Sequence, residues 1–105
     1  MNKLNYANST CLPSLKLLGD FWTLRIIDAL SEGDLRYCEL QRRVDNLNPV
    51  TFTNRLRKLE AAGLIKRIEQ PKAGVSYKLS SLGVDILPVL SAIDKFSSRA
   101  KTVSS

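Results

Sequence analysis

The sequence feature that most restricts the fold is a helix with a clear signal at each end, expected over residues 49–62. Asn48 precedes Pro49, and this pair starts a helix because the asparagine side chain can accept an unpaired backbone N–H while proline supplies a helical φ. Gly63 is placed to close the helix, since an ending helix often needs a residue that tolerates left-handed dihedral angles. A shorter helix is expected just before it, over residues 35–44. Two helices joined by so short a connection predict a helix-turn-helix motif.

The periodicity changes from helical to extended directly after Gly63. Residues 64–68 and 75–79 are expected to form two short strands, and Pro71 and Gly74 between them are typical of a turn. A β-hairpin in this place, after the second helix of the motif, is a wing. We therefore expect a winged helix-turn-helix fold, mainly α-helical with a small β-hairpin.

Two further helices are expected at the ends of this unit. The first covers about residues 13–30 and is apolar on two opposite sides, so one side is left for another chain, for the terminal segments or for the interior of its own domain. The last begins after Ser80 or Ser81 and carries one apolar stripe. We expect a kink in it near residues 84–87, because Pro88 removes one backbone donor.

The chain length of 105 residues suits one domain, and 44% hydrophobic with 25% charged residues is an ordinary globular composition. We expect this domain over residues 11–97, a flexible N-terminus over residues 1–10 and a flexible tail over residues 98–105. No window has the roughly 18 uninterrupted apolar residues of a membrane span, and the first ten residues lack the apolar core of a signal peptide. These features predict a cytoplasmic protein with reduced cysteines.

Histidine is absent from the sequence, and its absence favours a binding protein over an enzyme. Without histidine no Ser-His-Asp or Cys-His pair can form, and two cysteines alone make a poor metal site. We expect a binding protein with no catalytic residue, no metal and no cofactor.

Positive charge is concentrated in the middle of the chain. The net charge is +6, from 16 Lys+Arg against 10 Asp+Glu. Residues 36–78 carry ten basic and four acidic side chains, a difference of +6, so the remainder of the chain is neutral. This distribution is typical of a module that neutralises the phosphates of a nucleic acid.

One side of the helix over residues 49–62 is the expected reader of base edges. With Phe52 turned inward, Thr51 and three later residues share an outward stripe at the spacing i, i+3, i+4, i+7. Asn, Arg and Thr can contact adenine, guanine and thymine in a major groove, while basic residues beside them contact phosphates. The expected DNA contacts are Arg36, Asn48, Thr51, Asn54, Arg55, Arg57, Lys58 and Lys72.

Five segments of the chain, in their order, resemble the HxlR-type transcription regulators, winged helix-turn-helix proteins related to the MarR group. They are CLP near the start, LLGDFWTLRII, LRYCEL, TNRLRKLEAAGLIKR and YKLSSLGVDILPVL, and the resemblance covers about residues 11–96. It implies a homodimer joined through N-terminal and C-terminal helices, with two recognition helices in successive major grooves of an inverted repeat. The apolar residues expected at this interface are Leu17, Phe21, Leu82, Ile86, Val89, Leu90, Ile93 and Phe96.

The resemblance also implies a way in which a signal could reach the protein. Some HxlR-type regulators sense electrophiles or oxidants through a cysteine at the position that Cys11 resembles. Cys11 is expected to precede the first helix, where a thiolate is stabilised, and the alternative is a small, partly buried apolar residue. Whether the protein responds to a redox or small-molecule effector therefore stays open at this point. Cys38 is expected to have no redox role.

Two other functions remain open beside a DNA-binding transcription regulator. A protein-interaction winged helix in a larger assembly would use the basic surface for an acidic partner. An RNA-binding winged helix would be expected to expose more aromatic residues than the three Tyr, three Phe and one Trp available here, most of which are expected inside.

Overall fold

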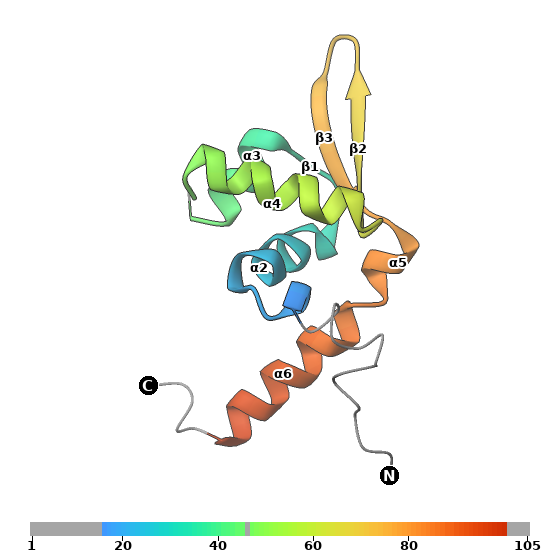
Figure 1. Ribbon diagram of the computed structural model, residues 1–105. Helices are drawn as coiled ribbons and strands as arrows, with labels where there is room; N and C mark the ends of the chain where they lie inside the picture. Colours follow the sequence, from blue (N-terminus) through green and yellow to red (C-terminus); the bar gives the residue numbers. More distant parts are fainter. Residues whose placement is uncertain (1–15, 46, 101–105) are drawn as a thin grey trace.

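The structure is a computed structural model that describes residues 16–45 and 47–100 of the chain. In chain order its elements are α2 (Phe21–Ala29), the 3-10 helix η1 (Leu30–Glu32), β1 (Leu35–Arg36), α3 (Tyr37–Arg43), α4 (Pro49–Ala61), β2 (Ile65–Gln70), β3 (Gly74–Leu79), α5 (Ser81–Val84) and α6 (Leu87–Ala100). Figure 1 shows the β2–β3 hairpin extending past α4 as a wing, while α6 projects to the other side of the helical group. The expected winged helix-turn-helix fold is confirmed.

Helix α4 has the two end signals that the sequence predicts. The Oδ1 atom of Asn48 accepts hydrogen bonds from the backbone N–H groups of Val50, at 2.9 Å, and Thr51, at 3.4 Å. Pro49 occupies the first helical turn, and Gly63 beyond the last turn has a φ of 79°, in the left-handed region that favours glycine. The position of α4 in the chain is therefore set by local chemistry.

The hydrophobic core holds α4 against the helices that precede it. Phe52 of α4 is fully buried, and its ring meets Tyr37 of α3 edge to face, with 5.0 Å between ring centroids. The buried core comprises Ile26, Ile27, Ala29, Leu30, Leu40, Val44, Phe52, Leu56, Leu59, Leu64, Ile65 and Tyr77. Because α2, α3 and α4 all contribute to one core, packing fixes the orientation of α4.

The sheet differs from the prediction in one strand. Its order is β1-β3-β2, all antiparallel, and Leu35 of β1 pairs with Tyr77 of β3. The helix expected over residues 35–44 therefore begins at Tyr37, because Leu35 and Arg36 are extended and pair with β3. The two wing strands are confirmed and run slightly longer than expected, with residues 71–73 as the turn.

The single helix expected over residues 13–30 is interrupted. Residues 16–18 are helical, but Asp20 has extended dihedral angles (φ −88°, ψ 119°) and starts α2 as its N-cap. A carboxylate oxygen of Asp20 accepts the backbone N–H of Thr23 at 3.0 Å, and this competition by a short polar side chain ends one helix and begins the next. The part of the expected helix before residue 16 lies outside the described residues.

The C-terminal end of the fold is divided where the proline signal predicted a kink. Ser80 caps α5 by accepting the backbone N–H of Gly83 at 3.0 Å, and residues 85–86 separate α5 from α6. Helix α6 continues to Ala100, so residues 98–100 of the expected tail are helical.

The expected flexible segments at residues 1–10 and 101–105 lie outside the described part of the chain. None of the described helices is both long enough and apolar enough to cross a membrane.

Candidate nucleic-acid interface

The side of α4 that faces away from the core is exposed, polar and cationic. Its exposed residues include Val50, Asn54, Arg57 and Lys58, and the first three follow the spacing i, i+4, i+7 on the side opposite the buried residues. Asn54 and Arg57 can donate hydrogen bonds to acceptors on base edges or phosphates, and Val50 offers an apolar surface. We call Val50, Asn54, Arg57 and Lys58 the outward face of α4.

The outward face differs from the expected stripe in a defined way. Thr51 and Arg55 are half-buried, and Arg55 lies against the start of α2, whereas Val50 is 69% exposed and was not expected as a contact. The sequence contained the signal that finds Val50: a helical wheel centred on the three buried residues of α4 puts it opposite the core. Taking Thr51 as the start of the stripe rotated the expected face toward α2.

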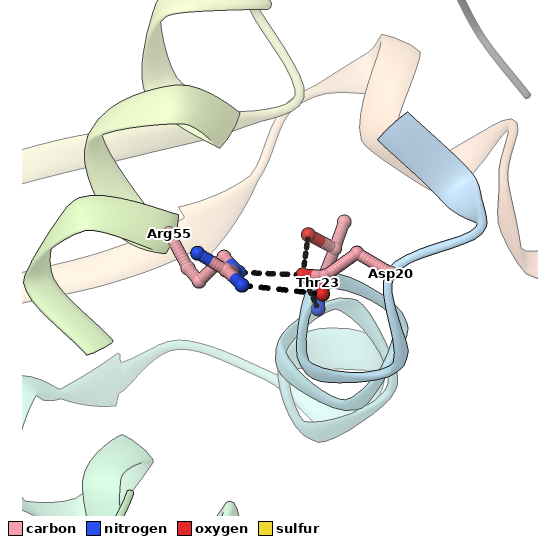
Figure 2. A network of polar contacts seen from close by, with 3 residues as sticks. All are labelled: Asp20, Thr23 and Arg55. Carbon is pink, nitrogen blue, oxygen red and sulfur yellow. Dashed lines mark hydrogen bonds and ion pairs between the residues drawn. The ribbon is translucent and has the colours of Figure 1, made fainter. Parts of the chain in front are cut away.

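Arg55 is bound within the protein rather than free for a ligand. Figure 2 shows its guanidinium facing the carboxylate of Asp20, where Nε donates at 2.6 Å to one oxygen and Nη2 at 3.4 Å to the other. The same carboxylate accepts the hydroxyl of Thr23 at 2.8 Å and the Thr23 backbone N–H. Arg55 therefore ties the middle of α4 to the first turn of α2, and its expected contact with a base would require this network to open.

The network also governs the charge of Asp20. Burial alone would raise the pKa of this carboxyl, but the hydrogen bonds from Arg55 and Thr23 outweigh burial and hold the pKa below its ordinary value. Asp20 is thus ionised at neutral pH and its charge is matched by Arg55. The two side chains are each a little over a quarter exposed.

The opposite side of α4 is fixed to α3. The hydroxyl of Tyr37 and the Oγ1 atom of Thr53 lie 3.1 Å apart and share a hydrogen bond. With Arg55 bound on one side and Thr53 on the other, α4 is held from both sides, and its outward face is left exposed.

The remaining expected DNA contacts include residues just before α3, on the wing and at the start of α4. Lys72 is exposed in the turn of the wing, and Arg36 is exposed at the start of α3. Arg36 and Arg42 border a hollow of about 630 Å³ that the wing residues Ala73 and Val75 also line, so this end of α3 and the wing are neighbours. Arg42 was not among the expected contacts. Asn48 is exposed, but its side-chain oxygen serves as the cap of α4.

The apolar residues expected at a dimer interface divide into two groups. Leu17, Ile86 and Leu90 are half-buried and pack against the core of their own chain. Phe21, Leu82, Val89, Ile93 and Phe96 are large, apolar and exposed. Within the second group, Phe21 on α2 and Ile93 on α6 face one hollow of about 640 Å³, and α6 contributes no buried residue at all.

Of the two cysteines, Cys38 lies in the described part of the chain. Cys38 is an exposed free thiol on α3, and Cys11, the expected sensor position, lies outside the described residues. Residues 16–45 and 47–100 contain no group of three or more His, Cys, Asp or Glu side chains that could hold a metal ion.

Comparison with known proteins identifies the family to which this arrangement belongs. The family of HxlR-like helix-turn-helix proteins matches residues 17–104, nearly all of the chain. The chain belongs to the HxlR-like family. An HTH-type transcriptional regulator of Halalkalibacterium halodurans is 36% identical over 80 residues, covering 73% of this chain and 71% of the relative. Another, of Methanothermobacter thermautotrophicus, is 33% identical over 78 residues and covers 72% of this chain.

A solved structure agrees with the family assignment. A transcriptional regulator of the MarR family from Porphyromonas gingivalis W83 superposes with a TM-score of 0.82 at 30% identity, over 91% of this chain and 96% of that one. The chain spans 60% of the length of the Methanothermobacter relative. The resemblance to HxlR-type proteins is thus confirmed, and so is the expected class of function, a DNA-binding transcription regulator of the helix-turn-helix type. The protein-interaction and RNA-binding alternatives are not favoured.

Proposed function

We propose that this HxlR-like protein acts in the cytoplasm as a homodimer that inserts α4 of each protomer into the major groove of an inverted-repeat operator. The observation that carries the proposal is the outward face of α4, which is exposed and free of acidic residues, on a helix hydrogen-bonded to its neighbours on both sides. Asn54 has the chemistry to read a base edge, and Arg57 and Lys58 have the chemistry to contact bases or phosphates. Arg36 and Lys72, which lie where the start of α3 and the wing are neighbours, would contact the phosphate backbone.

The second part of the proposal is the dimer. The exposed apolar residues of α6 and the hollow that Phe21 and Ile93 face form a surface that a second copy of the chain would cover. An isologous dimer carries two copies of α4 related by a two-fold axis, and an inverted repeat has the same symmetry. Two half-sites about one helical turn apart, roughly 34 Å, would then be engaged together.

The experiment that tests the proposal is nuclease protection on the DNA upstream of the protein's own gene, followed by affinity measurements on the protected sequence. We expect a protected inverted repeat that the protein binds far more tightly than a random duplex, with affinity that falls steeply as salt rises. Single-stranded RNA serves as the comparison ligand. Equal, weak and salt-insensitive binding to all three nucleic acids would contradict the proposal and favour a protein-interaction module.

The role of Asn54 is tested by Asn54→Ala on that protected sequence. If Asn54 reads a base, the variant loses about 1–3 kcal/mol of binding free energy on the specific site and almost none on a random duplex. Ser98→Ala on α6 is the matched control, because it changes an exposed polar side chain outside both the outward face of α4 and the hollow that Phe21 and Ile93 face. An equal loss on specific and random DNA would show that Asn54 contacts the backbone.

A further inference from the structure

A second hollow lies beside α4, next to its outward face, where α4 meets the residues that lead into α2. Its volume is about 420 Å³, and its lining joins two segments far apart in the sequence. The residues that line it are Lys16, Leu17, Asp20, Thr23, Arg55 and Lys58. We call this hollow the flank notch. Lys16 stands outside the basic middle segment of the chain, so the charge distribution along the sequence does not point to it.

The charges around the flank notch do not cancel. Three of its residues are cationic and one, Asp20, is anionic. The carboxylate of Asp20 is already bound to Arg55, whose Nε lies 2.6 Å from it. Neither Lys16 nor Lys58 has a carboxylate oxygen of another described residue within 4.0 Å. Two positive charges are left to face an anion in the notch.

The protein holds Lys16 beside α4 and does not leave it on a free end. Leu17, the next residue, packs against the hydrophobic core. The backbone N–H of Asp20 donates to the carbonyl of Leu17 at 3.4 Å, which closes the turn between residues 16–18 and α2. Lys16 therefore starts from an anchored backbone, and its side chain ends in a compact charge with three donors, which suits a phosphate.

The position of the notch suggests the source of that phosphate. Lys58 follows Asn54 by four residues, about one helical turn, and it belongs both to the outward face of α4 and to the lining of the notch. A duplex whose major groove receives the outward face has a phosphate backbone at each edge of that groove. The backbone on the α2 side of α4 would then pass the mouth of the notch.

We propose that the flank notch binds a phosphate of the DNA backbone, with Lys16 and Lys58 as its cationic contacts and the Asp20–Arg55 pair as its neutral floor. This inference rests on the proposed function, because it adds a contact to the same duplex. It assigns DNA binding to a residue of the segment before α2, so that the position of this segment and the affinity for DNA become coupled.

The test is the salt dependence of duplex binding by the full chain carrying Lys16→Ala. Each phosphate contact that is lost lowers the steepness of log Kobs against log salt by about one, so a dimer that loses one contact in each protomer should lose about two. We expect Lys16→Ala to show this decrease equally on the protected sequence and on a random duplex, since phosphates carry no sequence information. Lys16→Arg keeps the charge and is expected to keep the wild-type slope.

The matched control is Lys95→Ala, which removes the same charge from an exposed position on α6, away from the notch. Sedimentation and thermal unfolding establish that each variant keeps the fold and the association state of the wild type. A slope unchanged in Lys16→Ala, or lowered by the same amount in Lys95→Ala, overturns the proposal.

A free anion is the competing occupant, and it is examined by replacing chloride with inorganic phosphate at constant ionic strength. If phosphate raises the melting temperature of the wild type but not of Lys16→Ala, while both have the same slope on DNA, the notch is a site for a free anion and the proposal is wrong. The wild-type slope separately tests the proposed function. A wild type without salt-dependent duplex binding overturns both, whereas a steep wild-type slope shared by Lys16→Ala overturns the notch alone.

Discussion

Helices α4 and α6 are nearly equal in length, with 13 and 14 residues, but they stand in opposite relations to the core. Helix α4 buries Phe52, Leu56 and Leu59 completely or almost so, and turns a polar face to the outside. Helix α6 buries no residue and exposes Val89, Ile93 and Phe96. The apolar side of α4 is thus satisfied within one chain, whereas the apolar side of α6 is not. The same kind of amphipathic pattern therefore gives α4 a buried apolar side with an exposed polar face, and gives α6 an exposed apolar face.

The largest effect is expected in the core beneath α4. Phe52→Ala removes a fully buried ring and leaves a cavity, so the free energy of unfolding should fall by about 3–5 kcal/mol. Chemical denaturation followed by circular dichroism measures this loss. The corresponding change on α6, Phe96→Ala, is the control, since its side chain is exposed in a single chain. A similar loss for both variants in dilute protein would show that α6 is covered within its own protomer.

The next largest effect, on dimer formation, is expected at the exposed apolar stripe of α6. Val89→Asp combined with Ile93→Asp puts two charges on the exposed apolar stripe and should separate a dimer into folded monomers, seen as half the mass in sedimentation. Loss of the second half-site should then weaken binding to an inverted repeat by about 100-fold or more. Ser98→Asp combined with Lys95→Asp changes exposed polar positions of the same helix and should leave the dimer intact. A dimer unchanged by the first pair of substitutions would place the interface elsewhere.

The contrast between the two helices also shows what could be predicted from sequence. The bounds of α4 follow from Asn48 and Gly63, whose signals act within a few residues of the helix ends. The apolar stripe of α6 and the break before Pro88 are likewise local patterns. These elements were predicted because each depends on residues that are neighbours in the chain.

The missed features depend on residues that are distant in the chain. Arg55 was expected to face DNA because the sequence does not reveal that Asp20, 35 residues earlier, lies beside it. Leu35 and Arg36 were expected in a helix because their pairing partners on β3 come about 40 residues later, and tertiary pairing overrides a local helical pattern. The rotation of the expected stripe toward Thr51 has the same origin, since Arg55, a member of that stripe, is bound by Asp20 at the start of α2.

A smaller effect is expected at the network that joins the two segments. Asp20→Asn keeps a side-chain oxygen able to cap α2 but removes the charge that Arg55 binds, so the free energy of unfolding at pH 7 should fall by about 1–2 kcal/mol. The pKa of Asp20 is lower in the folded protein than in the unfolded chain. Its contribution is therefore complete above the unfolded pKa, near pH 4, and is lost as the pH falls through the folded value.

The measurement that isolates this contribution is the difference in stability between wild type and Asp20→Asn as a function of pH. The difference should be constant from pH 7 to about pH 5 and shrink below pH 4. Asp34→Asn, at an exposed carboxylate outside this network, is the control for replacing a carboxylate by an amide. A difference that stays constant down to pH 2 would mean that the ion pair adds nothing beyond the cap.

The smallest effect is expected at Val50, where a substitution should weaken DNA binding without lowering stability. Val50→Ala removes two methyl groups from an exposed helical position, and alanine has the higher helix propensity, so the free energy of unfolding should stay equal or rise by a few tenths of a kcal/mol. If Val50 touches an apolar group in the major groove, such as a thymine methyl, the affinity for the protected sequence should fall by several-fold, on the order of 1 kcal/mol. Fluorescence anisotropy and urea unfolding on the same sample measure both quantities. Weaker DNA binding in a variant that is no less stable would distinguish the outward face of α4, which is exposed for a ligand, from the stripe of α6, which is exposed for a second copy of the chain.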